Sequence, residues 1–462
     1  MNISILTVFP ELYEAFISSS IIARSVEKGL VSFNLVRFSD LVPPKVRIDS
    51  PTCGHGAGML LKPDVIEKAL AVCQEKWGNG TVIFFSPQGI KLNQRILKQF
   101  AQKHCFNTVA EPATDNAINT INSTDQQTTK PHIILVCARY EGIDTRVEHA
   151  YADYMISVGD YVLMGGDIPA QLFLEGLLRL IPGVVGKQES VEDDSFSGPL
   201  LDYPEYTHPI EWHGEKIPDI VTSGNHGAVT TWRTEQACKK TVLQRFDWFR
   251  QQQPEKKYLT CAKKFIPNHY VAIMHTQIVL KGGTIGQSSV ASLDIHDVAR
   301  TARTYDVENF FIVCPLRDQQ QIIGTFLEFW YSDKGQEYNK GRSDAVQRIQ
   351  PVNELTEVLA FIEEKEGKKP LIITTSARHY DQIPTIDYYS QSEVWQQERP
   401  VLLIFGTGQG LAPEVLEQSD YLLLPVQGMC DYNHLSVRSA VSIILDRWLG
   451  LQPKLNKLKP AK

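Results

Sequence analysis

The sequence has 462 residues, enough for several domains, and 43% hydrophobic with 21% charged residues, the composition of a soluble globular protein. Its net charge of −7 argues against broad sequence-independent nucleic-acid binding, which favours a basic domain, but leaves room for a local basic patch around one folded RNA. No apolar run is long enough for a membrane span, the start "MNISILTVFP" lacks the basic region of a signal peptide, and the cysteines show no metal-ligand spacing, which together predict a cytoplasmic protein.

The first half of the chain alternates short apolar runs with helical patterns. Residues 63–77 space their apolar side chains as an amphipathic helix does. Strands that alternate with helices predict a mostly parallel sheet covered on both faces, which is an α/β fold. The expected strands are residues 3–9, 31–38, 81–86, 133–138 and 154–163.

Two stretches interrupt this alternation. Residues 107–131 are rich in Asn and Thr and poor in large apolar residues, which predicts an inserted surface loop. The polar stretch 250–258, "RQQQPEKKY", predicts a linker. Beyond it the alternation of strands and helices restarts, so the chain is expected to hold two α/β domains in tandem. The strands expected there are residues 269–280, 309–316, 370–377, 400–408 and 421–428, followed by a last helix over 436–450.

Three strand ends in the first half are marked by glycine: "SPQG" (86–89), "ARYEG" (138–142) and "GDYVLMGGD" (159–167). In an open α/β sheet, ligands bind beyond the carboxyl ends of the strands, and glycine lets backbone groups approach a ligand closely. Any one of these stretches is also typical of an ordinary turn, but the three together indicate a small-molecule site. "GTGQGL" (406–411) does not fit a dinucleotide site, because its third glycine arrives one residue early.

A loop-like stretch follows over residues 186–206, "GKQESVEDDSFSGPLLDYPEY". Adjacent carboxylates such as Asp193 and Asp194 usually serve as solvated or capping groups in a loop. A carboxylate here can instead act as a general base if substrate binding orders the loop and excludes water.

These motifs together resemble the bacterial tRNA (guanine-N1)-methyltransferases of the TrmD type, over residues 1 to about 250. The resemblance is carried, in order, by "LTVFPELYEAF", "FSPQGIKL", "LVCARYEGID", "SVGDYVLMGG", "IPGVVG", "DDSFSGPLLDYPEYTHP", "SGNH" and "WR". It implies the SPOUT fold, an α/β domain with a deep trefoil knot, followed by a small helical tRNA-binding region. It also implies a homodimer that transfers a methyl group from S-adenosylmethionine to N1 of the guanosine 3′ of the tRNA anticodon.

The resemblance also implies the roles of individual residues. Asp194 is expected to take the N1 proton, and Arg179 to stabilise the anionic O6, for which family members also draw on Mg²⁺. Glu141 is expected near the methionyl end of the cofactor. The residues implied to bind S-adenosylmethionine are Phe84, Phe85, Ser86, Pro87, Gly89, Ala138, Glu141, Gly142, Ser157, Val158, Gly159, Asp160, Tyr161, Val162, Leu163, Gly165 and Gly166.

Several alternatives stay open at this point. Arg179 could pair instead with a carboxylate at the dimer interface, and Asp193 could take the role given to Asp194. His226 and Arg233 are expected to contact tRNA. The sequence departs from the family pattern at residues 53–59, and also at Phe84, Ala138 and Met164.

The second half resembles ribose-methylating SPOUT enzymes in three motifs, with Arg300 in the arginine position of the first. Its candidate cofactor residues are Gly406, Gly408, Gly410 and Leu435, and Arg300 could equally be a structural ion-pair partner. This half is expected to be either a second RNA methyltransferase, acting on ribose 2′-OH, or a non-catalytic module for dimerisation or RNA docking. The expected division is 1–186, 187–250 as interdomain loop and helical region, 251–267 as linker, and 268–452 as second SPOUT-like domain.

Overall fold

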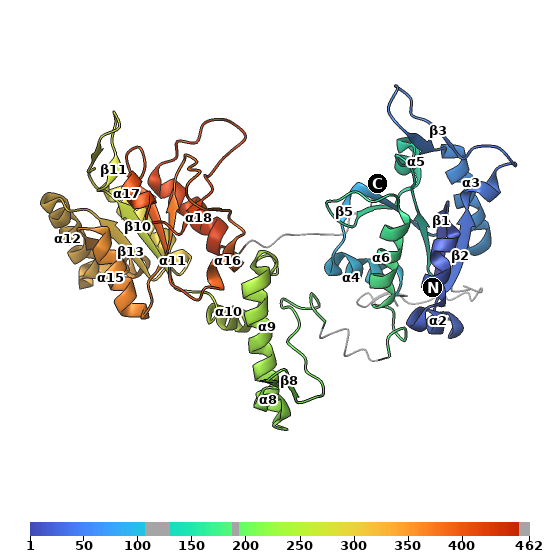
Figure 1. The fold of residues 1–462 in the computed structure, drawn as a ribbon, viewed down its shortest axis with the longest axis horizontal. Helices are drawn as coiled ribbons and strands as arrows, with labels where there is room; N and C mark the ends of the chain where they lie inside the picture. Colours follow the sequence, from blue (N-terminus) through green and yellow to red (C-terminus); the bar gives the residue numbers. More distant parts are fainter. Residues whose placement is uncertain (107–129, 187–193, 452–462) are drawn as a thin grey trace, which may run out of the picture. The chain divides into compact units, whose positions relative to one another are not determined.

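The computed structural model describes residues 1–106, 130–186 and 194–451. The chain divides into two compact units, with the boundary between Gly198 and Pro199, and each is described by itself (Figure 1). The inserted loop predicted over 107–131 lies outside the described residues except for its last two positions, and Asp193 lies outside them as well. No helix within the described residues is both long enough and apolar enough to cross a membrane.

The first unit is built on a parallel five-stranded sheet, as the strand pattern predicted. Its strand order is β2-β1-β6-β5-β7. Ile5 of the first strand pairs with Leu35 on one side and with Leu135 on the other, so the first strand lies inside the sheet. The bounds are β1 (Asn2–Thr7), β2 (Ser32–Arg37), β5 (Thr81–Lys91), β6 (His132–Val136) and β7 (Tyr154–Ser157).

Helices cover both faces of this sheet, because both faces of its strands are apolar. The predicted helix over 63–77 is confirmed as α3 (Pro63–Trp77), and it packs on the face that carries Leu6 and Val136. Helices α4 (Gln94–His104) and α6 (Asp167–Leu178) pack on the opposite face (Figure 1). The shorter elements are η1 (Pro10–Tyr13), α1 (Glu14–Ser18), α2 (Ser20–Glu27), η2 (Phe38–Leu41), β3 (Asp49–Pro51), β4 (Met59–Leu61) and α5 (Thr145–Tyr151).

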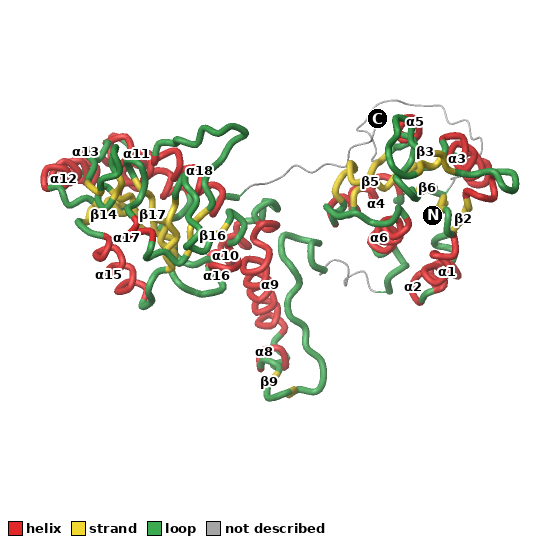
Figure 2. The backbone as a smooth tube through the Cα atoms, turned by 45° about the horizontal axis from the view of Figure 1, so that its top comes forward, coloured by secondary structure: helices red, strands yellow, loops and turns green. Residues whose placement is uncertain are grey.

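The second unit carries a larger parallel sheet of seven strands, in the order β14-β13-β10-β17-β15-β18-β16. Figure 2 shows this sheet between its helices. The five strands predicted in the second half are confirmed. Strands β14 and β16 lie at the two edges, and Pro351 in β14 is compatible with an edge because proline cannot donate to a strand partner. The bounds are β10 (His269–Met274), β13 (Asn309–Val313), β14 (Ile349–Val352), β15 (Leu371–Thr375), β16 (Thr385–Ile386), β17 (Val401–Gly406) and β18 (Tyr421–Leu423).

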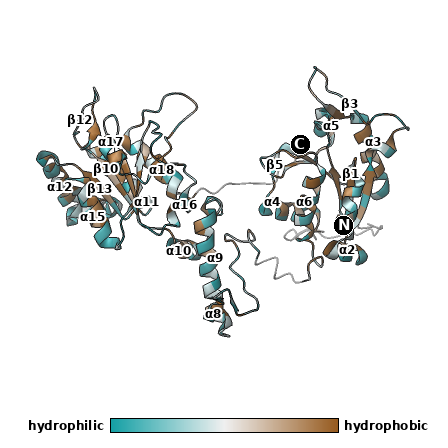
Figure 3. Ribbon diagram, viewed as in Figure 1, coloured by the Kyte–Doolittle hydropathy of each residue, from teal (hydrophilic) through white to brown (hydrophobic). Residues whose placement is uncertain are grey.

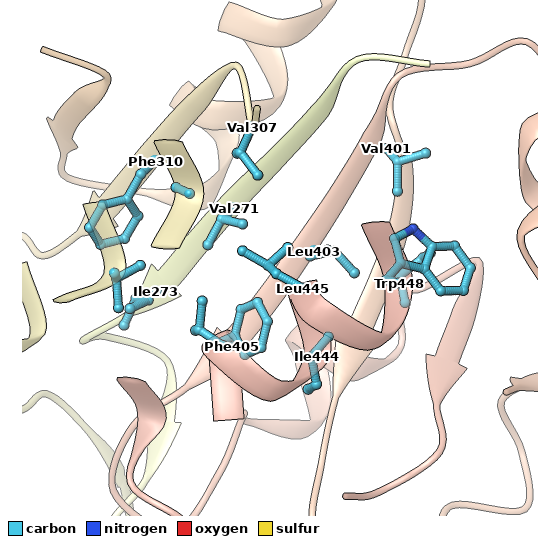
Figure 4. Packing of buried hydrophobic residues seen from close by; sticks show 14 of the residues in the cluster. Val271, Ile273, Val307, Phe310, Val401, Leu403, Phe405, Ile444, Leu445 and Trp448 are labelled. Atoms are coloured by element: carbon cyan, nitrogen blue, oxygen red, sulfur yellow. The ribbon is translucent and has the colours of Figure 1, made fainter. Parts of the chain in front are cut away.

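Helices again form a layer on each face of the second sheet. α15 (Leu355–Glu366) and α17 (Pro413–Leu416) pack on one face. The other face carries the large core shown in Figure 4, in which Val271, Leu403 and Phe405 meet Leu445 and Trp448 of the last helix. Helices on this second face are α11 (Ser292–Thr304), α12 (Arg317–Tyr331), α14 (Lys340–Val346), α16 (Gln391–Trp395) and α18 (Val437–Leu449), and α13 (Asp333–Tyr338) joins α12 to α14. A hairpin of β11 (Ile278–Val279) and β12 (Ile285–Gly286) follows β10.

The helical region after residue 198 belongs to the second unit. Helix α9 (His226–Phe249) is mostly hydrophilic in Figure 3, but its carboxyl end packs Phe246 against Trp395, with ring centroids 4.7 Å apart. The Arg250 guanidinium donates to the carbonyls of Asp446 and Arg447. The predicted linker contains α10 (Lys256–Lys263), which packs on α9. The smaller elements here are β8 (Glu211–Trp212), β9 (Glu215–Lys216) and α8 (Asp219–Thr222).

Candidate functional site

The first unit contains a cavity of about 450 Å³, a volume in the usual range for ligand pockets. It lies beside residues 85–88, where the pairing of β5 with β7 is interrupted by a bulge, and beside the segments that follow β6 and β7. Most of the residues predicted to bind the cofactor line this cavity. They are Phe85, Ser86, Pro87, Ala138, Glu141, Gly142, Ser157, Val158, Gly159, Tyr161, Val162, Leu163, Gly165 and Gly166. The three glycine-marked stretches therefore surround one site, as the sequence pattern predicted. The prediction that "SPQG" (86–89) follows a strand was wrong, because β5 continues through a bulge to Lys91.

Three predicted cofactor residues are not among those that line the cavity. Phe84 is buried against α3, on the other face of the sheet. A Cβ atom at Gly89 would lie 2.5 Å from the Ile156 backbone nitrogen, so this glycine permits β5 to approach β7. Asp160 is exposed and pairs with Lys91 at 2.6 Å. The structure therefore does not bring these three residues to the cavity wall.

The segment after β7 is held against the end of β6. The Gly166 backbone N–H donates to Ala138 O at 2.8 Å, and Arg139 and Gly165 form an antiparallel bridge. A Cβ atom at Gly166 would lie 2.8 Å from the Ala138 nitrogen, which is closer than real Cβ atoms come to backbone. Glycine is required here because two backbone segments are in direct contact.

A buried carboxylate anchors this arrangement, and the sequence interpretation did not identify it. Asp167 is 1% exposed, begins α6, and accepts from Thr7 Oγ1 at 2.5 Å and from Arg139 Nε at 2.8 Å. The Tyr13 hydroxyl lies 3.2 Å from the same carboxylate, and burial together with Cys137 and Asp167 raises the pKa of this phenol. A buried carboxylate needs such partners, so Asp167 ties β1 and the end of β6 to α6.

Two carboxylates face the cavity, and a loop approaches one of them. Glu141 and Glu148 both line the cavity, and burial raises the pKa of Glu148. The Glu141 N–H donates to Met59 O at 3.0 Å, so β4 reaches the end of β6. A Cβ atom at Gly58 would lie 2.3 Å from Glu141 Cγ, which places the divergent loop of residues 53–59 beside this carboxylate.

The two predicted catalytic residues contact each other. Arg179 follows the last residue of α6, and its Nη2 and Nε atoms lie 2.6 and 2.7 Å from Asp194 Oδ2. Their side chains are 42% and 35% exposed, so the pair is open to a large ligand. Arg179 therefore pairs with Asp194 of the same unit, and does not need a carboxylate across an interface. Neither residue is among those that line the cavity, in the part of the chain that the structure describes.

The residues predicted to contact tRNA lie on α9. His226 is its exposed first residue, and Asn225 caps the helix by accepting from the Ala228 N–H at 3.1 Å. The Arg233 guanidinium lies over the Tyr203 ring, 4.4 Å from its centroid. This end of α9 therefore presents polar and aromatic groups to solvent.

The candidate cofactor residues of the second unit are placed differently. The turn of Gly406, Gly408 and Gly410 contacts the hairpin after β10: the Val279 N–H donates to Gly410 O, and the Gln409 N–H donates to Val279 O. Leu435 is exposed in the segment before α18. Arg300 lines a different cavity on α11. Within residues 1–106, 130–186 and 194–451, no group of three or more His, Cys, Asp or Glu side chains is placed to hold a metal ion.

Comparison with known proteins gives matches over nearly the whole chain. A family model described as tRNA (guanine-1)-methyltransferase TrmD matches residues 1–112 and 108–251, and one described as SAM-dependent RNA methyltransferase matches residues 268–450.

Similar curated proteins carry the name tRNA (guanine-N(1)-)-methyltransferase. The protein of Nitratidesulfovibrio vulgaris is 34% identical over 97% of this chain and 99% of its own length, and that of Oleidesulfovibrio alaskensis is 33% identical over the same shares. The protein of Dictyoglomus turgidum is 37% identical over 54% of this chain and 89% of its own length. The chain therefore belongs to the TrmD-type tRNA (guanine-1)-methyltransferase family, whose cofactor is S-adenosylmethionine.

Proposed function

We propose that the chain methylates N1 of the guanosine 3′ of the tRNA anticodon, with S-adenosylmethionine as methyl donor, and does so in the cytoplasm. The observation that carries this proposal is the contact between Arg179 and Asp194. On guanine, the N1–H donor and the O6 acceptor are adjacent on one edge of the base. A carboxylate and a guanidinium held together can therefore face both groups at once.

The chemistry at guanine N1 explains why such a pair is needed. Neutral guanine has a proton on N1 and no in-plane lone pair there, so the proton must leave as the methyl group arrives. Asp194 accepts this proton as a general base. The negative charge that remains is shared with O6, and Arg179 donates to O6 and stabilises that charge. The sulfonium of S-adenosylmethionine supplies the electrophilic methyl group.

We assign cofactor binding to the cavity beside the bulge in β5 and the ends of β6 and β7. Its glycine-marked walls offer backbone groups to a ligand, and Glu141 and Glu148 are placed to offset the positive charge of a sulfonium compound. Mg²⁺ is commonly held through one or two carboxylates, with water and substrate as further ligands. Glu141 is the residue we propose for such a contact, and the roles of Asp194 and Arg179 do not depend on it.

We further propose that the chain acts as a homodimer whose partner completes the site. The proposed base lies outside the cavity wall of its own chain, while large apolar side chains are exposed beside that cavity: Val162 is 92% exposed, Met164 is 90%, and Ile168 and Leu172 on α6 are half exposed. Gln171 Nε2 donates to Leu12 O at 2.8 Å, which adds exposed Leu12 to this face. Large apolar side chains exposed in one region of the chain are typical of a protein interface.

The remaining proposals concern the division of the chain. The first SPOUT domain, with its trefoil knot, is proposed for residues 1–186, with the tRNA-binding region over 187–250 and a second SPOUT-like domain over 268–452. The compact unit that begins at Pro199 supports grouping the tRNA-binding region with the second domain, and the stretch 251–267 then connects two parts of that unit.

The decisive experiment is methyl transfer to unmodified tRNA transcripts that carry G or A immediately 3′ of the anticodon. We expect N1-methylguanosine on the G transcript alone, and Asp194→Asn to lower the rate constant by about 10²–10⁴-fold, because the base is removed. Asp64→Asn removes the same charge from an exposed position on α3 and should leave the rate unchanged. Ribose methylation, or equal rates on both transcripts, would assign the activity to the second domain instead.

Mixing two inactive variants tests the shared site. Asp194→Asn removes the proposed base and Ala138→Leu fills the cavity, so each homodimer should be inactive. After subunit exchange, half of the dimers are mixed and each has one intact site, so about a quarter of the wild-type activity should return. No recovery, with mixed dimers present by mass, would show that each chain works alone.

A further inference from the structure

A second cavity, of about 340 Å³, lies in the second unit between α11 and the segment that leads into α14. It is separate from the strand ends of the second sheet, because its walls come from α11, from α14 and from Asn339, the residue that joins α13 to α14. The lining residues are Arg300, Arg303, Thr304, Asn339, Gly341, Arg342 and Ala345.

The charge of this cavity is positive and only partly offset. Arg303 pairs with Asp344 at 2.7 Å and with Asp306 at 3.5 Å. Arg300 and Arg342 have no carboxylate within 4 Å among the residues that the structure describes. No acidic residue is included in the described lining of the cavity. Two guanidinium groups are therefore left without a counter-charge at one hollow of the surface.

The other polar groups of the wall do not favour a cation either. Asn339 Oδ1 already accepts from the Arg342 N–H at 3.0 Å, which leaves the side-chain amide as a donor. The Thr304 hydroxyl donates to Arg300 O at 2.8 Å. Guanidinium groups in a fork geometry match the oxygens of phosphate, with two parallel hydrogen bonds from one side chain. The wall is thus suited to a phosphate group.

Exposed aromatic side chains lie on α12 and α13, the two helices that precede α14 and contact it. Tyr338 directly precedes Asn339, is 74% exposed, and lies 6.2 Å from Trp330 between ring centroids. Phe329 and Tyr331, on the same helix as Trp330, are also half exposed. Arginine beside an exposed aromatic ring is the combination by which proteins hold the backbone of RNA and stack on its bases. A free phosphate ion has no base that could stack on these aromatic rings.

From these observations we infer that the cavity between α11 and α14 binds a phosphate of an RNA backbone, with Arg300 and Arg342 as its main contacts. The identification of the RNA as tRNA rests on the proposed function, whereas the inference that the cavity binds a phosphate does not. The site gives the second unit a role in holding RNA that needs no cofactor, and it makes Arg300 a binding residue rather than a partner in a structural ion pair.

The test compares tRNA affinity in the full chain for two double variants. Arg300→Ala/Arg342→Ala removes both proposed phosphate-binding groups. Lys368→Ala/Lys369→Ala removes the same charge from the exposed turn between α15 and β15 and serves as the control. We expect the first variant to bind an unmodified tRNA transcript more weakly, by about tenfold or more. The slope of log Kd against log salt concentration should also fall, by about one for each phosphate that is no longer neutralised. The control should match the wild type in both.

A second pair of measurements keeps the result interpretable. Arg300→Lys/Arg342→Lys keeps the charge but not the fork geometry, so its affinity should fall between wild type and the alanine variant, at an unchanged unfolding temperature. Equal affinity and equal salt slope for the alanine variant and the control would overturn the inference. A second outcome would also overturn it: inorganic phosphate raises the unfolding temperature of the wild type but not of the alanine variant, while both bind tRNA equally well. The cavity would then bind a free phosphate ion and not the phosphate of an RNA backbone. Methyl transfer is scored separately, so a chain that fails to methylate but binds tRNA through this pair would overturn only the proposed function.

Discussion

The two sheets of the molecule share one design but use their glycine-rich strand ends differently. In the first unit, an irregular stretch within β5 and the segments after β6 and β7 line a cavity of about 450 Å³. In the second unit, the glycine turn after β17 is in contact with its own chain: the Ala412 N–H donates to Gln277 O, and a Cβ atom at Gly408 would lie 2.8 Å from Val279 O. Glycine at a strand end therefore indicates a close approach, but not whether a ligand or another backbone segment approaches.

The two units also bury different polar groups. The first unit holds a buried carboxylate, Asp167, next to its cavity, and the groups that satisfy it come from β1 and from the residue Arg139 on the cavity wall. The second unit buries His269 and Arg250, which are 3% and 1% exposed. The ion pair of Asp167 with Arg139 fixes the cavity wall in one arrangement, whereas His269 and Arg250 make hydrogen bonds away from the carboxyl ends of the strands of their own sheet.

The largest expected effect comes from filling the first cavity. Ala138→Leu adds a branched side chain after β6, on the wall of the cavity. We expect the rate of guanine N1 methylation to fall by about a thousandfold, because the larger side chain displaces the cofactor. Each non-hydrogen atom of a ligand that leaves such a wall forfeits about 0.3 kcal/mol of binding free energy or more. Methyl transfer and calorimetric titration with S-adenosylmethionine measure the decrease. Ser376→Leu makes the matched change after β15 and should leave this reaction intact. An equal decrease in both variants would contradict the difference between the two sheets.

The next effect concerns pH and separates the cores of the two units. His269 Nε2 accepts from the indole N–H groups of Trp395 at 3.3 Å and Trp448 at 3.0 Å, so this nitrogen must be unprotonated, and Nδ1 lies 2.7 Å from Pro267 O. Burial lowers the pKa of His269 to about 4. The unfolded chain takes up this proton below about pH 6.5 and the folded chain does not, so the stabilising contribution is complete above pH 6.5 and is lost as the pH falls toward 4.

Over that range we expect the second unit to lose about 3 kcal/mol of unfolding free energy through this one group. Denaturant unfolding followed by tryptophan fluorescence checks it, since Trp395 and Trp448 contact His269. His269→Asn keeps an acceptor for the indoles but does not titrate, so its stability should depend less on pH. His379→Gln, at an exposed position, should keep the wild-type dependence. An unchanged slope in His269→Asn would show that another group carries the acid sensitivity.

The sequence predicts the layers of both units well, because apolar runs of five or six residues buried on both faces are a strong and local signal. It also predicts which strand ends meet, since parallel strands end at the same edge of a sheet. Asp167 and Thr7 were not identified as site residues, because their pairing joins residues 160 apart and neither residue type signals burial. The contact of Arg179 with Asp194 likewise depends on how the segment after α6 returns, which spacing does not determine.

The stretch 250–258 shows how composition alone can misplace a boundary. Its polar residues resemble a linker, yet Arg250 is buried and donates to two carbonyls at the end of α18. A long side chain can bury its stem and still satisfy its charged head with backbone acceptors. A polar composition therefore does not distinguish a flexible linker from a segment that is fixed by hydrogen bonds.

A smaller effect should distinguish two glycines that each lie against backbone: Gly166, which precedes α6, and Gly406, which ends β17. A Cβ atom would lie 2.8 Å from the Ala138 nitrogen at Gly166, and 2.7 Å from the Leu411 nitrogen at Gly406. Alanine at either position should cost about 2 kcal/mol of stability, because backbone must shift. Only Gly166→Ala should also weaken binding of S-adenosylmethionine to the first cavity, measured by calorimetry. If Gly406→Ala weakened that binding as much, the effect would reflect a general disturbance instead of the cavity wall.

The smallest effect concerns the exposed end of α9, where Arg233 lies 4.4 Å from the centre of the Tyr203 ring. A cation over an aromatic ring at an exposed site contributes about 0.5–1 kcal/mol. Tyr203→Phe keeps the ring and should leave tRNA affinity unchanged, whereas Tyr203→Ala should weaken it by about two- to fivefold, because Arg233 loses the surface that orients it. Arg233→Ala should weaken tRNA binding at least as much as Tyr203→Ala, and the double variant should add little to it. Additive effects would mean that Tyr203 contacts RNA independently of Arg233, so that this end of α9 reads RNA through two separate groups.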